Sequence, residues 1–257
     1  MRQNLVKEKW RRGEIAYGAW LTIPSAYSAE IVAHAGYDWA CVDMQHGHIG
    51  YQVAVTMLLA LSTTETIPFV RVPWNEPGII GKMLDAGAMG VIIPMTNTPE
   101  ETRAAVSACL YPPLGARSYG PGRAALYGGP GYFEHANEQV TVIPMIETKE
   151  ALDAIDDILS VPRVDALLFG PSDMSISLGL PPALENPGPW EDAWRRIASA
   201  CHNHGVVAGV YASAALAPKH AAAGYRMIMV TNDATTLAQS TARDIAYLRA
   251  TGSMPPS

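Results

Sequence analysis

The sequence is poor in cysteine and in charged residues, and it has no long apolar run. Its three cysteines, Cys41, Cys109 and Cys201, are too widely spaced for a disulfide framework or a zinc-ligand pattern, so we expect buried free thiols in a reducing compartment. No apolar stretch approaches the roughly 18 residues that a membrane span needs. The polar, helix-like N-terminus has neither the apolar core nor the cleavage site of a secretory signal. These absences predict a cytoplasmic protein that does not enter membranes.

Charged residues make up only 16% of the 257-residue chain, and the formal net charge is −6. An acidic chain without a basic run gives no electrostatic reason to bind nucleic acid. An anionic substrate would therefore need locally placed cations or a metal ion. The apolar fraction of 49% is enough for a large core, and the low charge indicates that part of the surface is buried between subunits.

Short apolar runs alternate with helical patterns along the whole chain. Each run is apolar on consecutive positions and rich in Val, Ile and aromatic residues, which is typical of strands buried on both faces of a parallel sheet. Eight strand–helix pairs in this length predict an α/β fold of one domain, a (β/α)8 TIM barrel spanning residues 1–257. The predicted strands are residues 17–22, 39–43, 68–72, 90–95, 141–147, 165–169, 206–211 and 227–230. The predicted helices are residues 25–35, 52–62, 77–86, 99–110, 149–159, 190–204, 212–222 and 235–249.

Residues 111–139 interrupt this alternation, because they are rich in Gly, Pro and Tyr and carry Arg117, Arg123 and His135. A connection of this length is usually functional, as a lid or an assembly arm. An excursion that packs on a neighbouring subunit is the alternative.

Polar residues stand where several predicted strands end, which is where TIM barrels carry their chemistry. Strand 1 ends near Trp20, and strand 3 ends in Arg71. Charged groups at such positions are costly to bury without partners, so their convergence on one mouth indicates a site. Strand 2 ends in Asp43, with Gln45, His46 and His48 in the loop that follows; strand 5 ends in Glu147; strand 6 leads into Gly170, Pro171, Ser172 and Asp173.

Glu147 and Asp173 are the candidate metal ligands. They follow adjacent strands, and two carboxylates with water and substrate oxygens suit a hard octahedral ion such as Mg²⁺ or Mn²⁺. The alternative for Asp173 is a cap on the following helix. The Gly-Pro sequence before that helix also suits a bound carboxylate or phosphate.

Arg71 and His46 are the candidate residues for handling charge and protons. A guanidinium at a strand end can hold a substrate carboxylate or an enolate oxygen. The alternative role for Arg71 is an ion pair with Asp43 or Asp85. His46 can act as a base oriented by Asp43 or Asp85, although His48 shares its loop.

Lysine is absent from every predicted strand. Catalysis through a Schiff base needs an amine inside the barrel with a lowered pKa. Lys149 is the nearest lysine to the predicted mouth, and it is expected to open a helix. Stabilisation of an enolate by a metal ion is therefore the better interpretation.

The chain resembles the HpcH/HpaI family of class II pyruvate-type aldolases. The resemblance rests on GAWLTIPSAYSAEIVAHAGYDWACVDMQHG, IPFVRVPWNEPGIIGKMLDAGAMGVIIPM, GARSYGP, PMIETKEAL and LLFGPSDMSISLG, in this order over roughly residues 18 to 180. It implies a barrel that exchanges its C-terminal helix between subunits of a homohexamer.

The resemblance also implies roles for particular residues. The family's metal ligands match Glu147 and Asp173, its arginine matches Arg71, and its Asp–His–Asp arrangement matches Asp43, His46 and Asp85. Pyruvate would chelate the metal through its carboxylate and keto oxygens. Gln45 stands where the family usually has Glu, and Met145 stands where it often has Gln. The expected substrate contacts are Trp20, Gln45, Arg71, Met145, Gly170, Pro171 and Ser172.

Three functions fit these residues. The favoured one is a lyase that uses Mg²⁺, Mn²⁺ or Co²⁺ to cleave a 4-hydroxy-2-oxo acid reversibly into pyruvate, or a related 2-oxo acid, and an aldehyde through a metal-stabilised enolate. The same site could decarboxylate a 2-oxo acid or join the pyruvate enolate to another acceptor. A non-catalytic binding protein on a barrel scaffold is the third.

Overall fold

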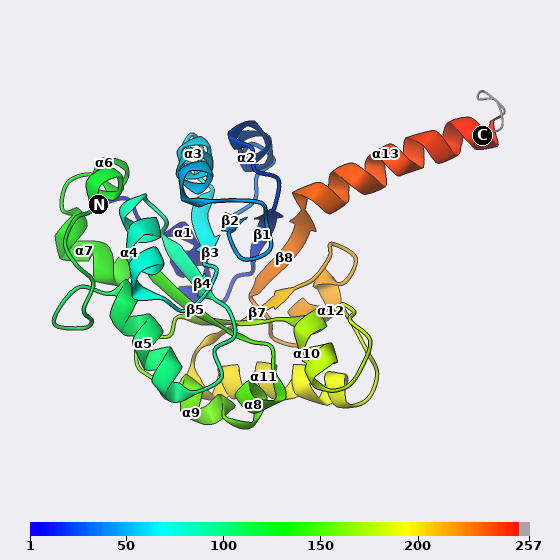
Figure 1. Cartoon of the computed structure of the whole chain (residues 1–257). Helices are drawn as coiled ribbons and strands as arrows, with labels where there is room; N and C mark the ends of the chain where they lie inside the picture. The colour runs from blue at the N-terminus through cyan, green and yellow to red at the C-terminus, as the bar shows by residue number, and fades with distance from the viewer. Residues whose placement is uncertain (252–257) are drawn as a thin grey trace.

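Eight parallel strands pair in chain order and close into a barrel, with helices outside them (Figure 1). The structure is a computed structural model and describes residues 1–251. The predicted TIM barrel is confirmed, and every predicted strand is present with ends that differ by at most two residues. The strands are β1 (Ala16–Leu21), β2 (Trp39–Asp43), β3 (Ile67–Arg71), β4 (Gly90–Ile93), β5 (Thr141–Ile146), β6 (Ala166–Phe169), β7 (Val207–Tyr211) and β8 (Met227–Asn232).

The helices cover the outside of this barrel and lie in the connections between strands. Two predicted helices are wrong in extent. The helix over residues 149–159 is two short helices separated by Ala154, and that over residues 212–222 begins only at Ala217, because Pro218 fits just the first turn. The helices are α1 (Leu5–Arg11), α2 (Ala26–Ala33), α3 (Tyr51–Leu61), α4 (Pro77–Asp85), α5 (Pro99–Cys109), α6 (Gly122–Gly128), α7 (Tyr132–Gln139), α8 (Lys149–Asp153), α9 (Ile155–Leu159), α10 (Pro171–Ser177), α11 (Pro189–His204), α12 (Ala217–Ala222) and α13 (Asp233–Ala250).

Large and small residues alternate inside the barrel. The rings of Trp39 and Phe69 stack with centroids 5.5 Å apart, and both side chains are fully buried. A Cβ atom at Gly18 would lie 2.0 Å from the Trp39 ring, and one at Gly90 would lie 2.5 Å from the Phe69 ring. The two glycines therefore make the room that the two aromatic rings fill, as close packing of a barrel interior requires.

Helix α1 closes the amino end of the barrel. Val6 is fully buried in the interior cluster, and the side-chain amide of Asn4 donates hydrogen bonds to the carbonyl groups of Met89 and Gln139 and to the hydroxyl of Thr141. Apolar side chains and hydrogen-bonded polar groups therefore fill this end of the barrel interior.

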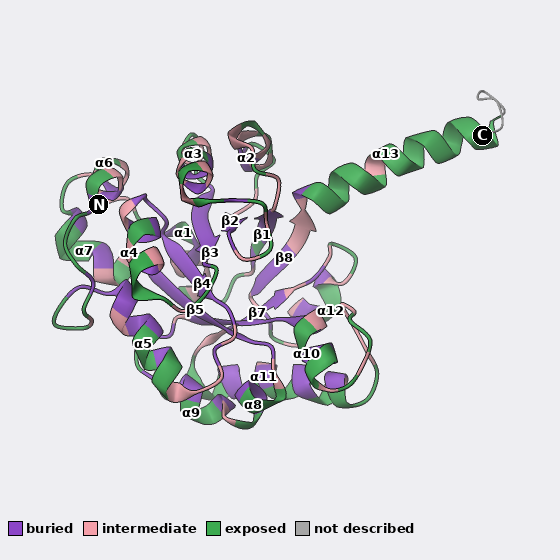
Figure 2. Cartoon of the chain, in the orientation of Figure 1, coloured by how far each residue is buried: buried purple, intermediate pink, exposed green. Residues whose placement is uncertain are grey.

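Helix α13 extends away from the barrel, and its residues are almost all exposed (Figures 1 and 2). Its first residue, Asp233, is buried and accepts hydrogen bonds from the backbone N–H groups of Thr22 and Ile23, which anchors the helix to the loop after β1. Beyond this anchor, apolar side chains such as Leu237 and Tyr247 are 58% and 67% exposed. The exchange of this helix between subunits stays a prediction.

The 111–139 segment is more ordered than its composition predicts, since it contains α6 and α7. Arg117 is buried and donates to Asp85 at 2.7 Å, while Arg123 donates to the carbonyl of Ala86 at 2.6 Å. The segment therefore packs on the end of α4 in its own chain. Within residues 1–251 none of it lines the pocket at the barrel mouth.

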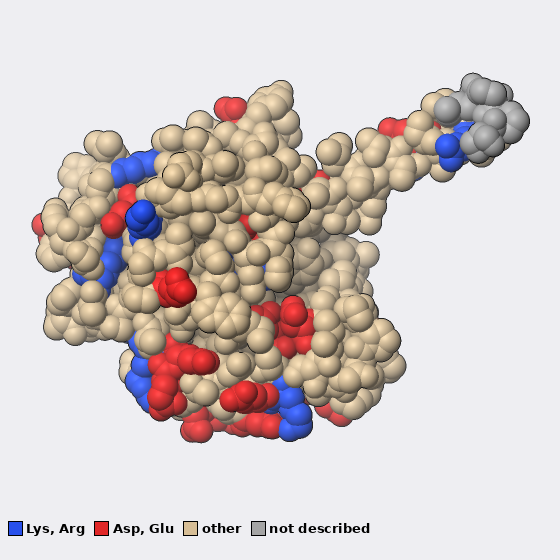
Figure 3. All heavy atoms as spheres, in the orientation of Figure 1, with Lys and Arg blue, Asp and Glu red and all other residues tan. Residues whose placement is uncertain are grey.

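The remaining bulk predictions concern thiols, membranes and charge. Cys41, Cys109 and Cys201 are free and buried, as expected. Within residues 1–251 no helix is both long and apolar enough to cross a membrane. Figure 3 shows acidic side chains gathered over α5, α8 and α9, whereas basic side chains are scattered over the visible face.

Candidate active site at the barrel mouth

A pocket of about 260 Å³ opens at the carboxyl ends of the strands. It contains most of the residues that the sequence singles out, although they come from segments far apart in the chain. The pocket is lined by Trp20, Thr22, Asp43, His46, Arg71, Met145, Gly170, Pro171, Ser172, Asp173, Tyr211 and Asn232.

Asp43 and Arg71 form a buried ion pair at the base of this pocket. The carboxylate accepts from Arg71 Nε at 2.8 Å and from Nη2 at 2.7 Å, and it also accepts from Trp20 Nε1 at 3.1 Å. Burial opposes the charge on Asp43, but the hydrogen bonds and positive charge of Arg71 outweigh it and keep the pKa of Asp43 below its usual value. Burial likewise opposes the charge on Arg71, and the carboxylate outweighs it, so the pKa of Arg71 is raised.

This pairing leaves one guanidinium nitrogen of Arg71 for a ligand. Nε and Nη2 are engaged by Asp43, while Nη1 lies 4.0 Å from the sulfur of Met145. The guanidinium also lies 4.9 Å from the centre of the Trp20 ring, which restricts its orientation. The ion pair with Asp43, one of the alternatives for Arg71, is therefore present and is compatible with a contact to substrate.

His46 lines the pocket from the loop after β2. Asp43 accepts from the backbone N–H of His46 at 3.4 Å and from that of Gln45 at 3.1 Å. The carboxylate thus holds the loop by its backbone, whereas the hypothesis from spacing was that it orients the imidazole ring. The side-chain oxygen of Gln45 is buried, and Gln45 does not line the pocket in the described part of the chain.

Asp85 lies away from the mouth. It is the last residue of α4, which runs back from the carboxyl end of β3 toward the amino end of β4. There it pairs with Arg117 at 2.7 Å. Within one chain the structure therefore does not bring Asp85 to His46, and an Asp85 that orients His46 would have to belong to another copy of the chain.

Glu147 is held rigidly just beyond β5 and is 2% exposed. Its Oε1 accepts from the backbone N–H of Met95 at 2.7 Å, and Met95 has the positive φ of 51° that few residues other than glycine adopt. A Cβ atom at Gly170 would lie 2.6 Å from Oε2 of Glu147, so only glycine there leaves the carboxylate in place.

Glu147 and Asp173 lie within electrostatic reach of each other. Burial raises the pKa of Glu147; the hydrogen bond from Met95 opposes this effect, and the negative charge of Asp173 adds to it. A divalent cation would relieve both effects, and the oxygen-only donor set fits Mg²⁺ or Mn²⁺. Because residues 1–251 contain no group of three or more His, Cys, Asp or Glu side chains arranged to hold an ion, water and substrate oxygens would complete the coordination.

Three pocket residues escaped the sequence interpretation. Thr22, Tyr211 and Asn232 follow or end β1, β7 and β8, so the criterion of polar residues at strand ends would have found them if it had been applied to every strand. Tyr211 packs its ring edge-on against Trp20 at 5.5 Å. The backbone N–H of Met95 has no signal in the sequence.

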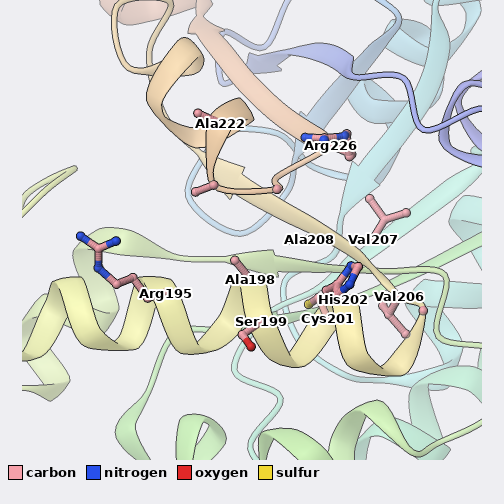
Figure 4. A pocket seen from close by; sticks show the side chains of 13 residues that line it. Arg195, Ala198, Ser199, Cys201, His202, Val206, Val207, Ala208, Ala222 and Arg226 are labelled. Carbon is pink, nitrogen blue, oxygen red and sulfur yellow. The ribbon is translucent and has the colours of Figure 1, made fainter.

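A larger cavity of about 650 Å³ lies elsewhere, between α11, α12 and the first residues of β7 (Figure 4). Its lining includes Arg195, His202 and Arg226, and within the part of the chain that the structure describes no carboxylate lines it. Because β7 begins there, this cavity is at the amino end of the barrel, opposite the polar mouth. The volume of a cavity therefore does not identify the active site in this protein. The convergence of charged side chains from different strands on one pocket identifies it better.

The fold and site together define a TIM-barrel protein with an acidic pair, an arginine and a histidine at its mouth. The chain belongs to the HpcH/HpaI aldolase/citrate lyase family, whose model matches residues 16–240. It is similar to a hydroxypyruvate/pyruvate aldolase of Rhizorhabdus wittichii, with 37% identity over 249 residues that cover 96% of this chain and 99% of that protein. It is also similar to a 4-hydroxy-2-oxo-heptane-1,7-dioate aldolase of Salmonella arizonae, with 34% identity over 243 residues that cover 92% and 91% of the two chains. The crystal structure of a family member from Burkholderia cenocepacia superposes with a TM-score of 0.90 at 35% identity and covers 96% of this chain and all of that one (100%).

Proposed function

We propose that this protein is a divalent-metal-dependent aldolase that reversibly cleaves a 4-hydroxy-2-oxo acid into pyruvate, or a related 2-oxo acid, and an aldehyde. The observation that carries the proposal is the buried carboxylate of Glu147 within electrostatic reach of Asp173, which lines the same pocket as Arg71. The names of the relatives support the same reaction class.

Glu147 and Asp173 would hold the metal ion, for which Mg²⁺, Mn²⁺ and Co²⁺ are the candidates. The ion would supply positive charge next to the negative charge that develops when the carbon–carbon bond breaks. The hydrogen bond from Met95 and the tight contact with Gly170 fix Glu147 before substrate arrives, so little reorganisation is needed.

Arg71 would donate from Nη1 to the keto oxygen of the substrate, which becomes the enolate oxygen. Its other two nitrogens are fixed by Asp43, so the donor is preorganised and cannot turn away. A preorganised donor of this kind typically contributes about 3 kcal/mol to stabilising the transition state.

His46 would take the proton from the C4 hydroxyl of the substrate. As the C3–C4 bond breaks, C4 becomes the aldehyde carbon and the bonding electrons enter the pyruvate enolate, which is then protonated at C3. His46 lines the pocket on a loop that Asp43 holds through two backbone N–H groups, so its ring can approach the hydroxyl while the loop stays fixed.

The test follows the exchange of pyruvate methyl protons in D₂O and the aldol addition of pyruvate to a short aldehyde. We expect both reactions to need a divalent ion, to stop in excess EDTA and to be lost in Glu147→Gln. The matched control Asp157→Asn removes an exposed carboxylate on α9 and should retain both. Robust turnover in excess EDTA would contradict the proposal, and binding of pyruvate without any exchange would favour a non-catalytic protein.

We also propose a cytoplasmic homohexamer in which α13 packs on a neighbouring copy. The helix presents exposed apolar side chains and makes few contacts with its own barrel beyond the Asp233 anchor. Light scattering on the full chain should give the mass of six chains, and a monomer mass would contradict this arrangement.

A further inference from the structure

One wall of the mouth pocket takes no part in the proposed chemistry. It consists of Thr22, Tyr211 and Asn232, from the carboxyl ends of β1, β7 and β8. All three side chains are polar and neutral, whereas the residues proposed to bind the metal and the 2-oxo acid are charged. The aldehyde part of the substrate must share this pocket with the 2-oxo acid, and these three residues line the pocket together with Arg71 and Asp173.

Asn232 and Tyr211 together present a hydroxyl donor. The Oδ1 atom of Asn232 accepts from the backbone N–H of Thr235 at 2.9 Å, as the N-cap of α13. The amide NH₂ group is therefore the part left to interact with the Tyr211 hydroxyl. Burial raises the pKa of Tyr211 against the opposing effects of Arg71 and Asn232, so its hydroxyl keeps its proton. With its oxygen facing the amide donor, Tyr211 has its O–H left to donate.

Thr22 presents an acceptor on the same wall. Its hydroxyl donates to Asp233 Oδ1 at 2.9 Å, and its backbone N–H donates to the same oxygen at 2.8 Å. The hydroxyl proton of Thr22 is therefore used in the bond to Asp233, and the lone pairs of the hydroxyl oxygen are left to accept a hydrogen bond. A donor and an acceptor that line the same pocket match a hydroxyl group, which both accepts and donates.

The charge of the pocket disfavours an acidic aldehyde. Arg71 is the one lysine or arginine among the described residues that line it, and Asp43 occupies two of the arginine's nitrogens. A carboxylate on the aldehyde would therefore lack a cation on this wall, whereas a hydroxyl would not need one.

We infer that Tyr211, Asn232 and Thr22 form a hydroxyl-binding wall, and that the preferred aldehyde carries a hydroxyl group near its carbonyl and no carboxylate. Tyr211 and Thr22 contact this hydroxyl, and Asn232 positions Tyr211. The inference rests on the proposed aldolase function and adds the chemical class of the acceptor.

The test compares aldehydes that differ in a single group. Glycolaldehyde and propionaldehyde differ by a hydroxyl in place of a methyl, and succinic semialdehyde adds a carboxylate. With pyruvate and Mn²⁺, we expect kcat/KM to be highest for glycolaldehyde and lowest for succinic semialdehyde. Because the two neutral aldehydes differ in intrinsic reactivity, the decisive quantity is how a variant changes the ratio of their kcat/KM values.

Tyr211→Phe should lower the ratio for glycolaldehyde over propionaldehyde about fivefold to tenfold, as the loss of one hydrogen bond predicts. Asn232→Ser keeps an N-cap but removes the amide donor, so it should raise KM for glycolaldehyde by a larger factor than it lowers kcat. The control Tyr27→Phe removes a hydroxyl from a residue that is 72% exposed and should leave the ratio unchanged.

Three outcomes would overturn the inference. An unchanged ratio in Tyr211→Phe, with propionaldehyde addition intact, refutes the wall while the aldolase function stands. A preference for succinic semialdehyde refutes the charge argument in the same way. Absence of pyruvate proton exchange in the unmodified enzyme refutes the aldolase function itself, and the inference fails with it.

Discussion

Gly170→Ala tests whether the position of the Glu147 carboxylate governs catalysis. The added methyl carbon would lie 2.6 Å from Glu147 Oε2 and 2.8 Å from its Cβ. An ordinary contact begins at about 3.4 Å, so the carboxylate must move by roughly 0.8 Å. Misplacement of a reacting group by about 1 Å can cost around 100-fold in rate. We therefore expect pyruvate proton exchange to fall about 100-fold and Mn²⁺ affinity to fall with it.

The backbone conformation at Gly170 is one that alanine can adopt, so we expect Gly170→Ala to fold. Gly170 has φ −95° and ψ 94°, which alanine adopts without strain. Gly78→Ala is the matched control, because Gly78 lies in α4 and a Cβ atom there meets nothing within 4 Å. The measurements are exchange rates by NMR, Mn²⁺ binding by calorimetry and thermal unfolding by circular dichroism. Gly170→Ala with the activity and Mn²⁺ affinity of Gly78→Ala would refute the reasoning.

Three further variants address the ion pair, a buried histidine and the absent Schiff base. Asp43→Ala leaves the buried Arg71 guanidinium without its partner, so urea unfolding should show a loss of about 3 kcal/mol or more, and a loss under 1 kcal/mol would contradict the pairing. His220 is fully buried, and burial lowers its pKa from 6.5 to about 4, so the unfolded chain binds the proton first. Stability should fall by roughly 3 kcal/mol as the pH drops from 6.5 to about 4. His220→Asn should make the free energy of unfolding, measured in urea at several pH values, depend less on pH. If the variant keeps the same dependence on pH, groups other than His220 cause it. Lys149→Ala should keep full aldolase activity, because Lys149 is exposed and paired with Asp153; loss of activity in a folded variant would revive a Schiff-base mechanism.

The barrel could be predicted from the sequence because its strands are buried on both faces. Runs such as residues 39–43 and 141–146 are buried at every position, and consecutive apolar residues report that directly. The helices were predicted less well where local chemistry decides their ends, as at Pro218. The helices α6 and α7 were missed, because a Gly- and Pro-rich segment gives no helical periodicity that stands out from a loop.

Those residues of the mouth pocket that stand at the ends of predicted strands could be predicted from the sequence. Asp43, Arg71 and Asp173 line one pocket because parallel strands all end on the same side of a barrel. The sequence could not choose between partners within that pocket: Arg71 had Asp43 or Asp85 as alternative ion-pair partners, and the structure pairs it with Asp43. Asp85 shows the limit most clearly, because a helix that returns to the amino end carries its last residue away from the mouth.

Titration with Mn²⁺, followed by calorimetry and by the exchange of pyruvate methyl protons, tests the central claim most directly. We predict that the unmodified protein binds Mn²⁺ and exchanges the protons only when the ion is present. Glu147→Gln and Asp173→Asn should each lose both properties while keeping the secondary structure of the barrel. Exchange that persists in excess EDTA, or Mn²⁺ affinity that survives removal of both carboxylates, would contradict the account.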